Sequence, residues 1–245
     1  MCQLLGFTAN KPHGINRLLK AFFADSVKHP HGWGIALLNP DKKFDLIKEP
    51  VAAHHSEKAV DLCSSPVSTN LAIAHIRFMT RGIQELVNTH PFVRNARKTE
   101  WILAHNGTIT YPFYFASSKN RPIGSTDSEK ILCFLSEKLK ISKSKDIQVI
   151  ENNLSLLSKF GKLNVLLSDG QHLYVYTNKV GTLFQLKFSN CTIFATKPIS
   201  TTNNMSWTQV PLNRLLVYKD GKEIYKSNEF TSYSTWSNKI KGGWF

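Results

Sequence analysis

Apolar residues recur at two different spacings along the chain, and each spacing predicts one kind of element. Runs typical of buried strands cover residues 3–9 and 70–78, whereas residues 15–24 place apolar side chains at helical spacing. A second helix is predicted to begin at Thr126, because Glu129 follows three residues later in the pattern of a capping box. Short β-rich runs then follow at 162–168, 172–178, 182–188, 192–196, 214–218 and 222–225.

The order of these elements predicts an α+β fold. Strands come first, two helices follow (one from Thr126 and one over 146–160), and the runs after residue 160 are interpreted as a meander of antiparallel strands. This order is typical of packed sheets covered by helices. No Pro- or Gly-rich linker divides the chain, so we expect a single domain over 1–245, with a tail at 226–245 that has no clear pattern.

Composition narrows the class of protein. A chain with 42% hydrophobic and 11% aromatic residues can build a sizeable core and is not disordered. The four cysteines form no CxxC pair, which argues against a zinc ribbon or a disulfide framework and suits a reducing compartment. No secretory signal and no apolar run of about 18 residues is present, so we expect a cytoplasmic protein with no membrane association. No zinc signature fits the spacing of His29, His31, His54 and His55. We therefore expect neither a metal nor a cofactor.

The net charge of +14 raises the hypothesis of a nucleic-acid partner. Residues 1–135 carry 16 basic and 10 acidic side chains and the remainder carries 15 and 7, so the excess is spread over both halves. The densest basic stretch, 138–145, falls where a helix is predicted to end, and cations there complement the helix dipole. Since no recognition motif accompanies the charge, a nucleic-acid partner is disfavoured.

Cys2 is the strongest candidate for chemistry. Removal of Met1, usual before a small second residue, would leave a thiol and a free α-amine on the same residue. The amine titrates near ~7.7–8.0 and a thiol near ~8.5, so at neutral pH the amine can accept the thiol proton. The alternative is that Cys2 is a small buried residue at the start of a strand.

Three further positions suit the same chemistry. Asn106-Gly107, between two apolar runs, is either a hairpin turn or a pair of amide donors for an oxyanion. Arg77 ends a buried strand, where a guanidinium needs a carboxylate from the protein or from a substrate. Asp127 falls at the first helical position, where it either favours the helix dipole or binds a substrate ammonium. Together these groups suit attack by Cys2 on a γ-glutamyl carbonyl.

At this point the sequence resembles the class II glutamine amidotransferases, whose nucleophile is an N-terminal cysteine. The resemblance covers about residues 1–225 and is closest to the stand-alone branch that includes γ-glutamyl hydrolases. The matching segments occur in the family's order and read MCQLLG (1–6), HGWGIA (31–36), AHIR (74–77), NTHPF (88–92), AHNG (104–107) and TDSE (126–129).

The resemblance implies a four-layer αββα sandwich of two mostly antiparallel sheets, of the N-terminal-nucleophile hydrolase type. It implies Cys2 as nucleophile and general base, with Asn106 and Gly107 as the oxyanion hole. Arg77 and Asp127 would bind the glutamyl α-carboxylate and α-ammonium, and Thr80 would line the same pocket. His90 and Trp33 resemble framework or pocket-wall residues.

The implied reaction is hydrolysis of glutamine or a γ-glutamyl compound to glutamate through a Cys2 thioester. The amide nitrogen would be released or passed to a partner. Two alternatives stay open: a glutaminase subunit that is active only with a separate synthase or peptidase subunit, and a catalytically silent module that binds a γ-glutamyl compound.

Overall fold

A computed structural model of the chain describes residues 2–79, 83–115, 118–199 and 206–230. These described residues contain four α-helices, and their strands form two sheets. The helices are α1 (Asn16–Phe23), α2 (Glu57–Ser64), α3 (Asp127–Ile141) and α4 (Asp146–Leu157). The first sheet contains β1 (Gln3–Gly14), β2 (Trp33–Leu38), β3 (Phe44–Glu49), β4 (Ser68–Ile76), β9 (Phe184–Lys187), β10 (Cys191–Ala195) and β11 (Thr208–Gln209). The second contains β5 (Phe92–Ala96), β6 (Thr99–Ile109), β7 (Gly161–Ser168), β8 (Leu173–Thr177), β12 (Leu216–Lys219) and β13 (Lys222–Lys226).

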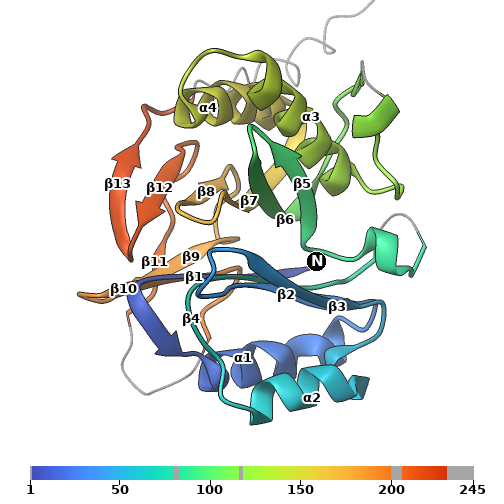
Figure 1. The fold of residues 1–245 in the computed structure, drawn as a ribbon, viewed down its shortest axis with the longest axis vertical. Helices are drawn as coiled ribbons and strands as arrows, with labels where there is room; N and C mark the ends of the chain where they lie inside the picture. The colour runs from blue at the N-terminus through green and yellow to red at the C-terminus, as the bar shows by residue number, and fades with distance from the viewer. Residues whose placement is uncertain (1, 80–82, 116–117, 200–205, 231–245) are drawn as a thin grey trace, which may run out of the picture.

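The two sheets lie face to face between two pairs of helices, as Figure 1 shows. The seven-stranded sheet has the order β11-β9-β10-β1-β4-β2-β3, and the six-stranded sheet has the order β13-β12-β8-β7-β6-β5. Every recorded strand pair is antiparallel. Helices α3 and α4 cover the six-stranded sheet, and α1 and α2 cover the other (Figure 1). The expected αββα sandwich is therefore confirmed.

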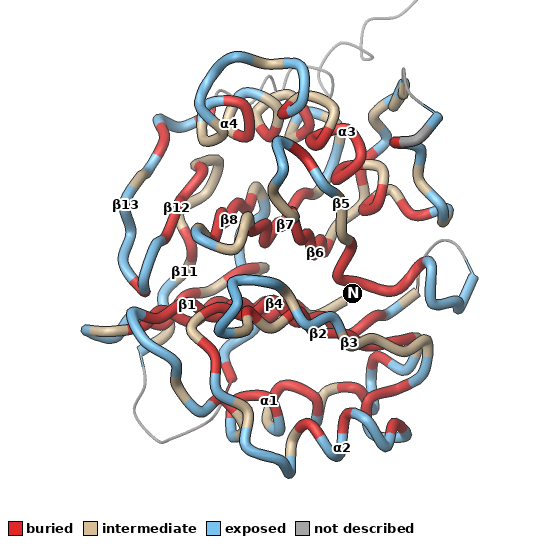
Figure 2. The backbone as a smooth tube through the Cα atoms, viewed as in Figure 1, coloured by how far each residue is buried: buried red, intermediate tan, exposed pale blue. Residues whose placement is uncertain are grey.

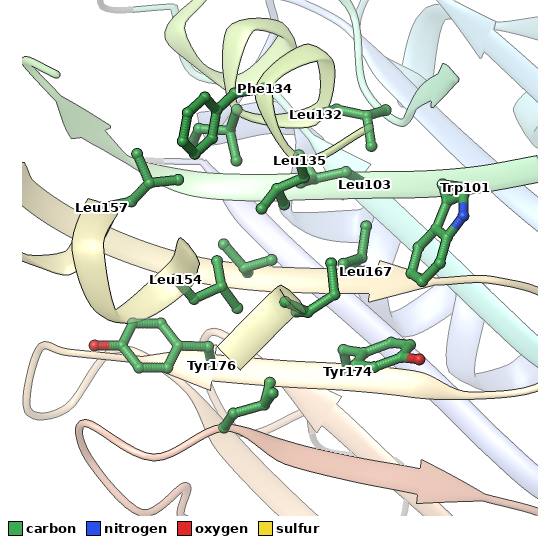
Figure 3. Packing of buried hydrophobic residues seen from close by; sticks show 14 of the residues in the cluster. Trp101, Leu103, Leu132, Phe134, Leu135, Leu154, Leu157, Leu167, Tyr174 and Tyr176 are labelled. Carbon is green, nitrogen blue, oxygen red and sulfur yellow. The ribbon is translucent and has the colours of Figure 1, made fainter. Parts of the chain in front are cut away.

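Three apolar layers hold the sandwich together, one between the sheets and one under each helix pair. Buried residues line the strands and the helix faces that turn toward them, as Figure 2 shows. Between the sheets, Leu4 and Ile73 lie in one cluster with Ile102 and Leu166 from the opposite sheet. Beneath α3 and α4, Trp101 and Leu103 pack with helix residues (Figure 3). Because successive strand residues point to opposite faces, β6 contributes to both layers.

Several predicted elements are confirmed. Helix α1 matches the helical spacing at 15–24, and α4 with the 3₁₀ turn that follows it covers 146–160. The Thr126 hydroxyl accepts a hydrogen bond from the Glu129 backbone N–H at 3.2 Å, so Thr126 does cap α3. The Glu129 carboxylate does not complete a capping box; it accepts instead from the backbone N–H groups of Ile123 and Gly124.

The prediction of a C-terminal meander was wrong. Strands β7 and β8 pair in the six-stranded sheet, but β9 and β10 lie in the seven-stranded sheet, and β12 and β13 return to the six-stranded sheet. The β10 strand pairs with β1 from the start of the chain, with Phe7 opposite Ile193. Turn residues mark where a strand ends but do not determine which sheet the next strand joins, so local patterns could not reveal this exchange.

Candidate active site

The thiol of Cys2 lies where β1 and β4 meet. Gln3 pairs with Ile76, which places Cys2 level with Arg77 one residue further along the ladder. The backbone N–H of Phe78 donates to Cys2 Sγ at 3.3 Å, and the Phe78 carbonyl oxygen lies 3.4 Å from the same sulfur. Burial raises the pKa of the Cys2 thiol, while the Phe78 N–H opposes that effect. The thiol is therefore the dominant form at neutral pH and needs a base to act as a nucleophile.

A turn ahead of β2 holds the segment that contacts Cys2. The backbone N–H of His31 donates to the Arg77 carbonyl at 3.1 Å, and the Arg77 N–H donates to the Gly32 carbonyl at 2.8 Å. The Met79 N–H donates to Nδ1 of His31 at 3.1 Å, and the His31 ring packs edge-on against Phe78. His31 thus organises the backbone around the thiol, a role that the sequence analysis did not predict because it considered this histidine only as a possible metal ligand.

The two glycines that flank Trp33 allow a turn on one side and a close approach of the backbone on the other. Gly32 has φ +140°, a conformation that favours glycine. A Cβ on Gly34 would overlap the backbone carbonyl oxygen of His90. Trp33 itself is fully buried and packs against Phe23, as expected of a framework residue.

Arg77 is 3% exposed and lies at the end of β4, as its position after a buried strand predicted. One of its guanidinium nitrogens, Nη1, donates to the Ile83 carbonyl at 3.0 Å. Burial lowers the pKa of Arg77, and the nearby Cys2 thiolate opposes that shift, as expected for two groups close together. Thr80, expected to line the same pocket, lies outside the described residues.

The hairpin interpretation of Asn106-Gly107 is wrong, because both residues lie inside the continuous strand β6. Gly107 pairs with Leu163 of β7, and a Cβ added to it would overlap the Lys162 carbonyl oxygen and lie 2.5 Å from Nε2 of His105. A tight approach by another strand, and not a turn, thus requires glycine here. Asn106 is 4% exposed, and strand alternation places it on the face between the sheets, the same face as Ala104.

Asp127 begins α3, as predicted, and its carboxylate faces β6. One oxygen accepts from the Ile109 backbone N–H at 2.9 Å and the other from the Ser128 N–H at 3.0 Å. These bonds hold the carboxylate at a defined position beside the strand that carries Asn106 and Gly107.

One small cleft contains most of the predicted site. It is lined by Cys2, Arg77, Gly107 and Asp127, together with Phe78, Met79, His90, His105, Thr108, Thr126 and Ser128. His90 is thereby placed in the pocket wall, as expected. A larger cleft of about 770 Å³ lies among turns that include Lys42, Lys98 and Asp169, and none of the predicted site residues lines it. Among the described residues, no three His, Cys, Asp or Glu side chains are placed to hold a metal ion.

Comparison with known proteins identifies the family. Residues 1–187 match the sequence model of the class II glutamine amidotransferases. The chain belongs to this family.

The relatives of this amidotransferase include proteins of bacteria and archaea. YafJ of Escherichia coli, named as a candidate glutamine amidotransferase, is 30% identical over 86% of this chain and 94% of its own length. An uncharacterized protein of Methanocaldococcus jannaschii is 32% identical over 94% of this chain and 73% of its own length.

Solved structures share the fold. A predicted glutamine amidotransferase from Pseudomonas aeruginosa has a TM-score of 0.62 at 23% identity, and it matches 91% of this chain and 100% of that one. The glutamine phosphoribosylpyrophosphate amidotransferase of B. subtilis has a TM-score of 0.66 at 18% identity over 94% of this chain. The chain spans about half, 49%, of that longer enzyme. In the described part of the present amidotransferase, no helix has the length and apolar character needed to cross a membrane.

Proposed function

We propose that this amidotransferase hydrolyses the side-chain amide of glutamine, or the equivalent bond of another γ-glutamyl compound, through a thioester on Cys2. One observation carries the proposal. Cys2, Arg77, Gly107 and Asp127 are far apart in sequence but line a single cleft. Hydrolysis of a glutamyl substrate requires four groups: a thiol, a hydrogen-bond donor for the oxyanion, a guanidinium and a carboxylate.

In the proposed reaction, removal of Met1 frees the α-amine of Cys2, which takes the thiol proton as the sulfur attacks the γ-carbonyl carbon. The side-chain amide of Asn106 and the N–H of Gly107 stabilise the resulting oxyanion. Collapse of the tetrahedral intermediate breaks the C–N bond, and the amine returns its proton to the leaving nitrogen. Water then attacks the thioester with the amine as base, which releases glutamate and restores the thiol.

Substrate binding is proposed to use two groups of opposite charge that line the cleft. The Arg77 guanidinium would bind the α-carboxylate, and Asp127 would bind the α-ammonium. Both groups are anchored by hydrogen bonds to backbone, Arg77 to Ile83 and Asp127 to Ile109. Such preorganised partners cost little entropy when the substrate binds. Thr80 is proposed to complete the pocket.

The test is glutamate release from L-glutamine, glutathione and other γ-glutamyl compounds by the purified protein, with intact-mass analysis of the N-terminus. We expect release from at least one compound, loss of Met1, and no release by Cys2→Ala. Cys63→Ala is the matched control, because Cys63 is also partly exposed but lies on α2. Turnover by Cys2→Ala, or full activity in a protein that retains Met1, would contradict the mechanism.

A partner-dependent glutaminase is the second candidate, and the length of one structural relative favours it. The B. subtilis enzyme carries about as much chain outside the matched region as within it. A protein that releases no glutamate alone but does so after a synthase or peptidase subunit is added would support this version. Binding of glutamine without turnover under either condition would indicate a silent binding module.

A further inference from the structure

The histidine before the Asn106-Gly107 pair faces away from the space between the sheets. His105 is 1% exposed and lies on the face of β6 that carries Trp101 and Leu103, toward α3. Its backbone continues into Asn106, but its ring contacts a different layer of the sandwich. The ring is thus in a position to link the strand of the proposed oxyanion hole to the helix above it.

Both ring nitrogens of His105 are engaged. Nδ1 lies 3.0 Å from the Ser128 hydroxyl oxygen, and Nε2 lies 3.3 Å from the Lys162 carbonyl oxygen. A carbonyl oxygen only accepts, so Nε2 carries the hydrogen, and Nδ1 accepts from the hydroxyl of Ser128. Burial lowers the pKa of His105 although the Asp127 charge opposes this shift, so the ring is neutral near pH 7. These contacts select one tautomer and hold the ring in one orientation.

The ring also packs directly against Gly107. Nε2 lies 2.5 Å from the position that a Cβ on Gly107 would occupy, so the imidazole fills the space that the missing side chain leaves. Any tilt of the ring would therefore move the peptide groups around Gly107 or open a gap beside them.

Two connections join β6 to the first turn of α3. One is the bond between His105 and Ser128, and the other is the bond from the Ile109 N–H to Asp127. They lie on either side of the segment that contains Asn106 and Gly107. The proposed oxyanion donors and the proposed ammonium-binding carboxylate are thereby held in one rigid unit.

We propose that neutral His105 is a positioning residue that sets the distance between the oxyanion donors and Asp127, and that it transfers no proton during the reaction. The inference rests on the proposed function. If His105 has this role, loss of the His105–Ser128 hydrogen bond misplaces the oxyanion donors, while Cys2 keeps its own contacts to Phe78. A shift of about 1 Å at such a site can cost about 10²-fold in rate.

Four variants test this role. His105→Leu removes both ring contacts, and Ser128→Ala removes only the hydroxyl in case the first variant fails to fold. Ser128→Thr retains a hydroxyl and should restore activity. Ser136→Ala is the matched control, since Ser136 is also a buried, hydrogen-bonded serine on α3 but bonds Asn120 and lies outside the cleft.

For each variant we would measure kcat and KM on the best substrate and the pH dependence of kcat/KM. We would also measure the rates at which two reagents modify the Cys2 thiol. Iodoacetamide reports the reactivity of the thiol alone, whereas the glutamine-analogue diazoketone 6-diazo-5-oxo-L-norleucine requires the glutamyl site as well. We expect kcat and inactivation by the diazoketone to fall together in Ser128→Ala, by about 10- to 100-fold. Alkylation by iodoacetamide and the shape of the pH profile should be unchanged.

The outcomes separate the two proposals. A wild-type protein that releases no glutamate from any compound, alone or with a partner, refutes the proposed function whatever the variants do. An active wild type with Ser128→Ala at full kcat, or with an equal loss in Ser136→Ala, refutes the positioning role alone. Loss of one limb of the pH profile in Ser128→Ala would instead make His105 a proton-transfer group, which also refutes the inference.

Discussion

A pair of stacked, buried histidines should make the fold sensitive to mild acid. His75 and His90 lie 4.0 Å apart between ring centroids, at 0% and 4% exposure. None of their four ring nitrogens has a hydrogen-bond partner among the described residues. Burial lowers the pKa of His75 to about 3, and burial also lowers that of His90 well below its usual value. Both rings are therefore neutral in the folded protein at physiological pH.

The size of the effect follows from proton linkage. In the unfolded chain His75 titrates near ~6.5, so between that pH and about 3 the unfolded state binds a proton that the folded state does not. The free energy of unfolding is unaffected by the titration of His75 above pH ~6.5, and it falls by about 1.4 kcal/mol for each pH unit below that value. At pH 5 the loss from His75 alone is about 2 kcal/mol. The lowered pKa values of His90 and His105 also reduce the free energy of unfolding as the pH falls.

Urea unfolding at pH 8, 7, 6 and 5 tests this prediction. Carboxylates with a lowered pKa, such as Glu49 and Asp169, lose their contribution only below about pH 4. Burial lowers the pKa of Lys48 to about 8, so Lys48 affects mainly the measurement at pH 8, and the slope between pH 7 and 5 reports on the histidines. We expect His75→Phe to reduce the slope of unfolding free energy against pH by about one proton. The same substitution at His55, which is exposed, is the control. An identical slope in wild type and His75→Phe would show that His75 is not held neutral by burial.

Two further substitutions test the site itself. Asp127→Asn should raise KM by about 10- to 100-fold, because a charge-assisted bond contributes roughly 1.5–3 kcal/mol. It should also lower the melting temperature, because one of the two backbone N–H groups that donate to the carboxylate would lose its acceptor. An unchanged KM in steady-state assays would rule out the ammonium role. Gly107→Ala should destabilise the fold by about 1–3 kcal/mol and reduce kcat, because its Cβ would overlap Lys162 and crowd His105. Gly14→Ala, whose Cβ would meet no atom within 4 Å, is the control, and equal unfolding free energies in the two variants would contradict the packing argument.

Much of the local structure follows from the sequence. The cap at Thr126 and the helical spacing at 15–24 depend on neighbours within a few residues, so they could be identified without the fold. The positions of Cys2, Arg77 and Asp127 also followed, because each lies at the end of an element, or next to that end, as its own pattern predicts. Their convergence in one cleft was expected from the family resemblance, and the structure places them together.

The tertiary structure alone decided the rest. Gly107 looked like part of a hairpin because Asn-Gly favours turns, yet contact with β7 keeps it in a strand. Strands β9 and β10 lie in the seven-stranded sheet beside β1, which is distant from them in the chain. The hydrogen bond between His105 and Ser128 also joins residues that are far apart in sequence. Local sequence determines which conformations a segment favours. Which backbone packs against it is decided by contacts that form only when remote segments meet, and those contacts position the groups around Cys2.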